Sequence, residues 1–158
     1  MYGKIMVCID CSDAGYRVLD EAIRLAAADR AELHIVHVID LPYLLVTVSF
    51  YDPVTLITAL RAKGTAMLEE ARQRANSASV PCTTQLAETE HLTESIAARL
   101  QRCAEDCDAA LLVIGAHGHR GLDAVLPGSV VTRLSHIATC PVLLVPAVIR
   151  RPAERAVA

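Results

Sequence analysis

This chain of 158 residues has few aromatic residues and no large excess of either charge. Aromatic residues make up only 3% and Trp is absent, whereas hydrophobic residues make up 53%. The core must therefore consist mainly of Ala, Val, Ile and Leu. The formal net charge of −3 offers no clustered excess of Lys and Arg, on which nucleic-acid binding depends. We expect no nucleic-acid partner.

Long apolar runs and an export signal are also missing. No stretch approaches the roughly 20 apolar residues that span a bilayer, and residues 1–4 lead directly into a strand pattern rather than a signal peptide. We expect a cytoplasmic protein with no membrane partner. The length predicts one nucleotide-binding domain over residues 1–149, followed by a short flexible tail over residues 150–158.

The six cysteines are placed too irregularly for a disulfide scaffold. In a reducing compartment such residues behave as small buried hydrophobes. Cys8 and Cys11 form a C-x-x-C pattern, but Cys8 falls inside a strand and Cys11 at its exit, so they do not share the helix start that activates redox pairs. Cys103 and Cys107 lack matched histidines, which disfavours a metal site.

Apolar runs of strand length alternate with amphipathic stretches of helical period along the chain. The strands are expected over residues 4–10, 32–39, around 81–86, 109–114 and 140–146, and the helices after residue 12 or 13 and over residues 53–76, 91–107 and 128–137. Ser12 or Asp13 is expected to cap the first helix and Thr93, or the residues just before it, the third. Gly64 should weaken the second helix without ending it. This alternation predicts a parallel α/β sheet with right-handed crossovers, whose ligands bind beyond the carboxyl ends of the strands.

A glycine-bearing loop follows the fourth predicted strand. The spacing is Gly115-x2-Gly118-x9-Gly128-Ser129, and Gly128-Ser129 opens an amphipathic helix. Glycine lets backbone N–H groups approach an anion, and a helix start adds unpaired N–H donors and a positive dipole end. The pattern suits a polyphosphate. The alternative is an ordinary strand-to-helix connection in which the glycines only turn the chain.

Four stretches in order resemble the universal stress protein family over residues 4–146. They are a first strand that ends in Asp10 followed closely by Ser12, a second strand that ends in His37-Val38, the glycine loop, and a closing strand at residues 140–145. The glycine spacing is similar to that of the family's ATP-binding subgroup.

The resemblance implies an open, Rossmann-like five-stranded parallel sheet of order 3-2-1-4-5 that forms a homodimer through the fifth strand, Val142–Val145. Pro141 and Pro146 bracket that strand. The expected ligand is ATP, with Mg or Mn. Asp10 would contact the ribose, with Ile9 beside it, and Val38 would contact adenine. The residues that would surround the phosphates are Gly115, His117, Gly118, Gly128, Ser129 and Val130. His119 and Arg120 are either further charge partners of the phosphates or solvated loop residues.

The sequence departs from the family pattern in two places. Many members have a glycine between the third strand and the third helix, where this chain has Glu88 and Glu90. If these carboxylates border the ligand they disfavour ATP unless a divalent ion intervenes; if they face away, nothing follows. Residues 41–50 are unusually apolar for a loop, which fits a lid, a strand added to a partner, a plug over the sheet or a partly buried structural loop.

The favoured function is an ATP-binding stress-response or signalling protein that acts through nucleotide-dependent conformation. The chain lacks a P-loop lysine and a GxGxxG after the first strand, so we expect at most slow ATP hydrolysis or autophosphorylation, with Ser12 or Ser129 as acceptor. The alternatives are a nucleotide-free interaction module of the same fold, a nucleotide-dependent hydrolase or transferase, and a cysteine redox protein.

Overall fold

Strands and helices alternate along the chain. The computed structural model describes residues 1–41, 52–91, 93–116 and 129–146. The elements are β1 (Lys4–Cys8), α1 (Asp13–Asp29), β2 (Glu32–Ile39), α3 (Pro53–Ser77), β3 (Cys82–Glu88), α4 (Ile96–Asp106), β4 (Leu111–Gly115), α5 (Ser129–Ile137) and β5 (Val142–Val145). The apolar residues 42–50, for which four roles were considered, lie outside the described residues.

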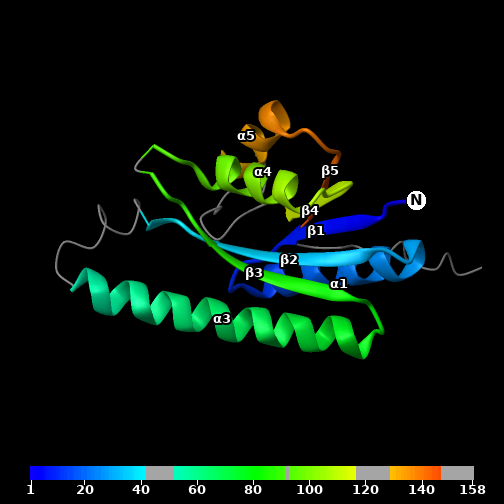
Figure 1. The fold of residues 1–158 in the computed structure, drawn as a ribbon, viewed down its shortest axis with the longest axis horizontal. Helices are drawn as coiled ribbons and strands as arrows, with labels where there is room; N and C mark the ends of the chain where they lie inside the picture. Colours follow the sequence, from blue (N-terminus) through cyan, green and yellow to red (C-terminus); the bar gives the residue numbers. More distant parts are fainter. Residues whose placement is uncertain (42–51, 92, 117–128, 147–158) are drawn as a thin grey trace, which may run out of the picture.

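The strands form one sheet in the order β3-β2-β1-β4-β5. Each neighbouring pair runs parallel, with α1 and α3 on one face of the sheet and α4 and α5 on the other (Figure 1). The predicted fold class and strand order are confirmed. Since helices cover both faces, the central strands bury side chains on both sides, which explains the nearly continuous apolar runs of β1 and β4.

The core is aliphatic and divided by the sheet into two clusters. Ile5 and Val7 of β1 join the cluster under α1 and α3, whereas Met6, between them, joins the cluster under α4 and α5. This alternation follows the two-residue period of a strand. All three side chains are fully buried.

The helix starts follow local hydrogen-bonding chemistry. Ser12 is the N-cap of α1 and accepts a hydrogen bond from the Gly15 N–H, in agreement with one of the two predicted caps. Asp52 caps α3 ahead of Pro53. The predicted cap at Thr93 and the predicted helix start at residue 91 are wrong, because Ser95 caps α4 by accepting from the Ala98 N–H.

The strands also differ from the predicted boundaries. β4 spans Leu111–Gly115 rather than 109–114, and β5 spans Val142–Val145 rather than 140–146. β1 ends at Cys8 rather than residue 10, and β3 continues to Glu88 rather than ending at residue 86. Residues that read as a polar loop, Ala87 and Glu88, pair with Val38 and Ile39 of β2. Tertiary pairing therefore extends a strand that local sequence ends early.

Gly64 does not interrupt α3, as predicted, and the structure gives it a packing role. It is buried in the middle of α3. A Cβ atom at this position would lie 2.7 Å from Leu86 Cδ1 and 3.0 Å from His37 Cδ2. Glycine therefore allows the long helix to lie close to β2 and β3.

Candidate functional site

The point where the strand order diverges lies between β1 and β4. The chain passes from β1 to β2 and β3 on one side, and β4 and β5 occupy the other side. In open parallel sheets, ligands bind beyond the carboxyl ends of the strands at this point. The described residues predicted to bind a nucleotide all lie at or next to that edge.

Asp10 lies two residues beyond β1, and its carboxylate is fixed against the start of α1. Asp10 Oδ1 accepts the Ser12 N–H at 3.1 Å and also the Ser12 hydroxyl. The same hydroxyl oxygen accepts the Gly15 N–H at 3.1 Å. This chain of bonds aligns a half-buried carboxylate at the carboxyl edge of the sheet, where it can accept hydrogen bonds from a sugar's hydroxyl groups.

Gly15 is a site element that pattern reading missed. It is buried in the first turn of α1. A Cβ atom there would lie 2.6 Å from Asp10 Oδ1 and would overlap the Asp10 carbonyl oxygen. The sequence showed only a glycine near a helix start, which by itself does not indicate that the backbone of the helix lies against another residue.

Ile9 and Val38 face opposite sides of the sheet. The Ile9 side chain is 3% exposed and belongs to the cluster under α1 and α3, so this side chain is not available to a ligand. Val38 is half-buried and packs against the cluster under α4 and α5. Val38 thus leaves part of an apolar side chain at the carboxyl end of β2, next to β1.

β4 and α5 bring the two described ends of the glycine loop to the same edge. Gly115 ends β4 opposite Val145, and the Ala116 N–H donates to the Val145 carbonyl at 2.8 Å. Ser129 begins α5, where it is exposed, and Val130 is half-buried. Ile114 and Val131 share one core cluster, which holds the start of α5 over the end of β4. His117, Gly118 and Gly128, like His119 and Arg120, lie outside the described residues.

The acidic residues Glu88, at the end of β3, and Glu90, two residues further on, are each paired with arginine. Arg61 of α3 binds both oxygens of Glu88, at 2.5 and 2.8 Å, and this lowers the pKa of Glu88. Glu90 lies 3.1 Å from Arg99 and 2.7 Å from Arg102. Each carboxylate therefore has a cation beside it, which offsets the repulsion that it would exert on a nearby phosphate.

Thr89, between those two glutamates, closes the gap between the ends of β2 and β3. It is 2% exposed. Its hydroxyl oxygen accepts the Leu41 N–H at 3.1 Å and its N–H donates to the Ile39 carbonyl at 3.1 Å. A polar residue in a polar stretch gave no signal of burial, so sequence reasoning missed this link.

The C-x-x-C cysteines differ sharply in environment. Burial, with a smaller effect of the nearby Asp10 carboxylate, raises the pKa of Cys8 to about 12. Cys11 is exposed. All six cysteines are free thiols. A thiol whose pKa is raised is a poor nucleophile at neutral pH, so Cys8 is not the activated cysteine of a redox site.

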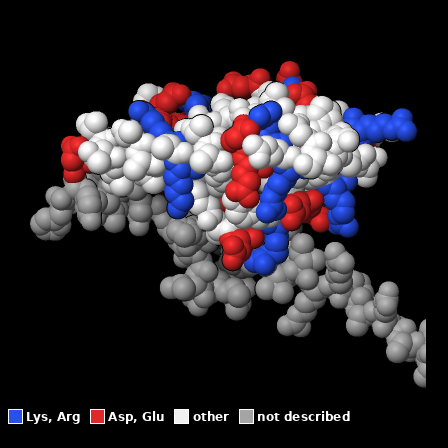
Figure 2. Space-filling view, turned by 90° about the horizontal axis from the view of Figure 1, so that it is seen from below, with Lys and Arg blue, Asp and Glu red and all other residues white. Residues whose placement is uncertain are grey.

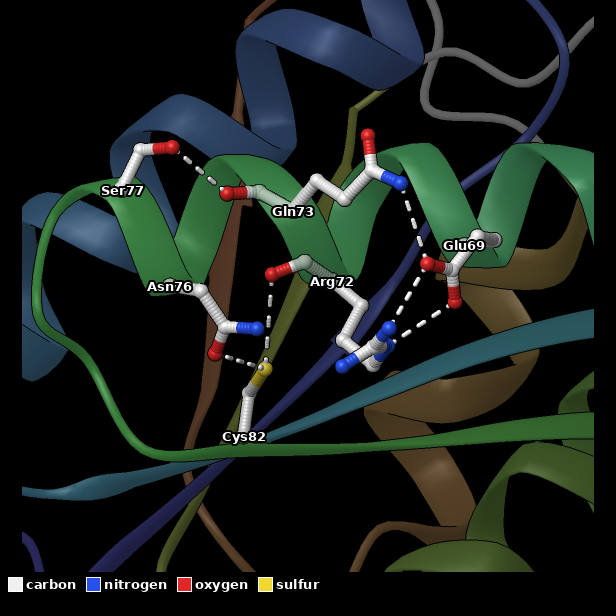
Figure 3. Close-up of polar contacts among 6 residues, drawn as sticks. All are labelled: Glu69, Arg72, Gln73, Asn76, Ser77 and Cys82. Atoms are coloured by element: carbon white, nitrogen blue, oxygen red, sulfur yellow. Dashed lines mark hydrogen bonds and ion pairs between the residues drawn. The ribbon is translucent and has the colours of Figure 1, made fainter.

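Charges are interspersed on the outer face of α3. Figure 2 shows Lys and Arg next to Asp and Glu across this face. Arg72 and Gln73 donate hydrogen bonds to Glu69 and lower its pKa to about 2 (Figure 3). The Cys82 thiol of β3 lies 3.9 Å from the Arg72 carbonyl oxygen. Such exposed pairs contribute little to stability, and they describe a solvated face rather than a binding site.

Two surface hollows among the described residues lie away from this edge of the sheet. One lies between α1 and α3 and another near the start of β5. Neither is lined by a residue predicted to bind nucleotide. Among the same residues, no cluster of three or more His, Cys, Asp or Glu side chains could hold a metal ion, and no helix is long and apolar enough to cross a membrane.

Comparison with known proteins gives consistent matches over nearly the whole length. Residues 1–146 match the model of the universal stress protein family. The chain is 33% identical over 153 residues to universal stress protein YxiE of Bacillus subtilis, with 92% of this chain and 99% of that protein covered.

Solved structures give the same result. A universal stress protein family member from Burkholderia pseudomallei is 34% identical, with a TM-score of 0.74 and 92% of this chain and 96% of that chain covered. A universal stress protein solved in complex with cAMP is 26% identical, with a TM-score of 0.67 and 93% of this chain and 98% of that chain covered.

Proposed function

Because this chain belongs to the universal stress protein family, we propose that it is a stress-response protein that binds ATP at the carboxyl edge of its sheet. Nucleotide binding would favour one conformation of the protein and thereby its choice of partner. The observation that carries the proposal is the convergence of the fixed Asp10 carboxylate, the Val38 side chain and the start of α5 at the point where strand order diverges.

Each group in this arrangement suits one part of ATP. The Asp10 carboxylate would accept hydrogen bonds from the ribose, and Val38 would contact the face of the adenine. Ile9 would contribute only main-chain atoms. The phosphates would lie against the glycine loop and the first turn of α5, where unpaired N–H groups and the positive end of the helix dipole favour an anion. The proposed phosphate-binding residues are Gly115, His117, Gly118, Gly128, Ser129 and Val130.

Mg or Mn would accompany the nucleotide by binding the phosphate oxygens, which spares the protein from supplying a complete set of metal ligands.

The neighbouring structure solved in complex with cAMP supports an adenine nucleotide as the ligand class. The pairing of Glu88 and Glu90 with arginines supports it as well, because a neutralised loop does not repel the phosphates.

The test is isothermal titration calorimetry with ATP and with inorganic tripolyphosphate, each in the presence of Mg. Asp10→Ala should weaken ATP binding about tenfold or more, because a hydrogen-bonded charged group is lost, and leave tripolyphosphate binding unchanged. Asp13→Ala, at an exposed carboxylate in the first turn of α1, is the matched control. Wild-type protein that binds no ATP would favour a nucleotide-free interaction module of this fold.

Gly118→Val provides the complementary test of the phosphate side. The branched side chain should crowd the loop and weaken both ATP and tripolyphosphate. Unchanged affinity for both ligands would remove this loop from the site.

A further inference from the structure

The side chain of His37, on β2, contacts the backbone of Ile9, the residue directly before Asp10. It is half-buried and directly precedes Val38, the proposed adenine contact. Its Nδ1 atom lies 2.9 Å from the carbonyl oxygen of Ile9. A carbonyl oxygen only accepts hydrogen bonds, so Nδ1 must carry the proton in this arrangement.

Both polar backbone groups of Ile9 are thereby held by β2. The Ile9 N–H donates to the Val36 carbonyl at 3.0 Å, one residue beyond the end of β1. The His37 side chain then takes the Ile9 carbonyl. The carbonyl of Ile9 and the N–H of Asp10 belong to one planar peptide unit, so this bond sets the direction in which the chain leaves β1 toward the Asp10 carboxylate.

The opposite side of the imidazole ring lies against α3. A Cβ atom on Gly64 would lie 3.0 Å from His37 Cδ2 and 3.6 Å from His37 Nε2. The ring is therefore confined between the end of β1 and the middle of α3, and it has little freedom to swing away from the Ile9 carbonyl.

We propose that His37 is a positioning residue of the nucleotide site, which orients the Ile9–Asp10 peptide so that the Asp10 carboxylate meets the ribose. This inference rests on the proposed function. It predicts that loss of the Nδ1–H donor weakens the contact between Asp10 and the ribose. Phosphate binding depends on β4 and α5, so the affinity for phosphate should not change.

A pair of near-isosteric substitutions tests the donor. In His37→Asn the amide Nδ2 is as many bonds from Cα as the lost Nδ1, so it can donate to the Ile9 carbonyl. In His37→Leu the shape is similar but the donor is absent. We expect calorimetry with ATP to give about tenfold weaker binding for His37→Leu and binding within about threefold of wild type for His37→Asn, with tripolyphosphate affinity unchanged in both.

His37→Gln replaces the Leu variant if that variant fails to fold, because its longer amide reaches the position of Nε2 rather than Nδ1 and should also weaken ATP. Unchanged ATP affinity in a folded donor-less variant would overturn the role of His37. So would an Asn variant as weak as the donor-less one, or a parallel loss of tripolyphosphate affinity. Wild-type protein that binds no ATP would instead overturn the proposed function, and the inference with it.

Discussion

At the scale of single residues, the contact between Gly15 and Asp10 limits how the chain can turn from β1 into α1. Gly15→Ala would place a Cβ atom 2.6 Å from Asp10 Oδ1, so the backbone must shift. We expect the free energy of unfolding to fall by about 1–3 kcal/mol, as in other overpacked sites, and ATP binding to weaken. Denaturant titration and calorimetry measure the two effects.

Gly3→Ala is the matched control, because no atom lies within 4 Å of a Cβ built at Gly3. It should change neither stability nor affinity. If Gly15→Ala behaves like this control in both measurements, the Asp10 turn is not held by close packing.

Thiol reactivity provides a second test at this scale. Burial raises the pKa of Cys8 to about 12 and that of Cys103 to about 11. A thiol with a pKa near 12 is ionised in only about one molecule in 10,000 at pH 8, and only the thiolate reacts quickly. We expect iodoacetamide to label the exposed Cys11 first, the half-buried Cys8 much more slowly and the buried Cys103 only after unfolding, as followed by peptide mass spectrometry. Labelling of Cys8 as fast as Cys11 in the folded protein would contradict the raised pKa of Cys8.

At the scale of elements, α5 depends on few buried side chains. It spans Ser129–Ile137 and its buried residues are Val131 and Leu134. Helices this short are not stable by propensity alone, so packing must hold them. Leu134 is fully buried, and Leu134→Ala should lower the free energy of unfolding by about 2–5 kcal/mol and weaken ATP binding, because the Ser129 end loses its support.

Thr132→Ala is the control within the same helix, at an exposed position. It should leave stability within about 0.5 kcal/mol of wild type. Equal effects of the two substitutions, measured by chemical denaturation and calorimetry, would refute the view that packing of α5 positions the phosphate side of the site.

Elements built on apolar runs could be predicted from the sequence, and those shaped by tertiary pairing could not. The bounds of β2 agree with prediction because its apolar run ends at Ile39. β3 and α4 were misjudged because Ala87 and Glu88 join the sheet through pairing with β2, and because Ser95 competes successfully with Thr93 as a cap. At the site, the family resemblance pointed to Asp10, and its role remains a prediction. The contacts of Gly15 and His37 could not be predicted, because they depend on how the folded backbone brings Gly15 against Asp10 and His37 against Ile9.

At the scale of the whole molecule, β5 forms an edge of the sheet. Leu143 and Leu144 on this strand are 36% and 41% exposed, an arrangement that favours pairing with a second copy. We propose a homodimer through β5 and expect the double variant Leu143→Lys, Leu144→Lys to sediment as a monomer while wild type sediments as a dimer. The control Val54→Lys alters an apolar residue that is 71% exposed on α3 and should remain dimeric. A wild-type monomer at high concentration, or a dimeric double variant, would contradict the role of this edge.

The proposed nucleotide site lies where β1, β2 and β4 end. The most direct measurement is an NMR titration of the ¹⁵N-labelled full chain with ATP and Mg, in which each backbone amide reports on its own surroundings. We predict saturable shifts concentrated at residues 9–12, Val38, Gly115, Ser129 and Val130. A spectrum that does not change at saturating ATP, or shifts confined to the groove between α1 and α3, would contradict it.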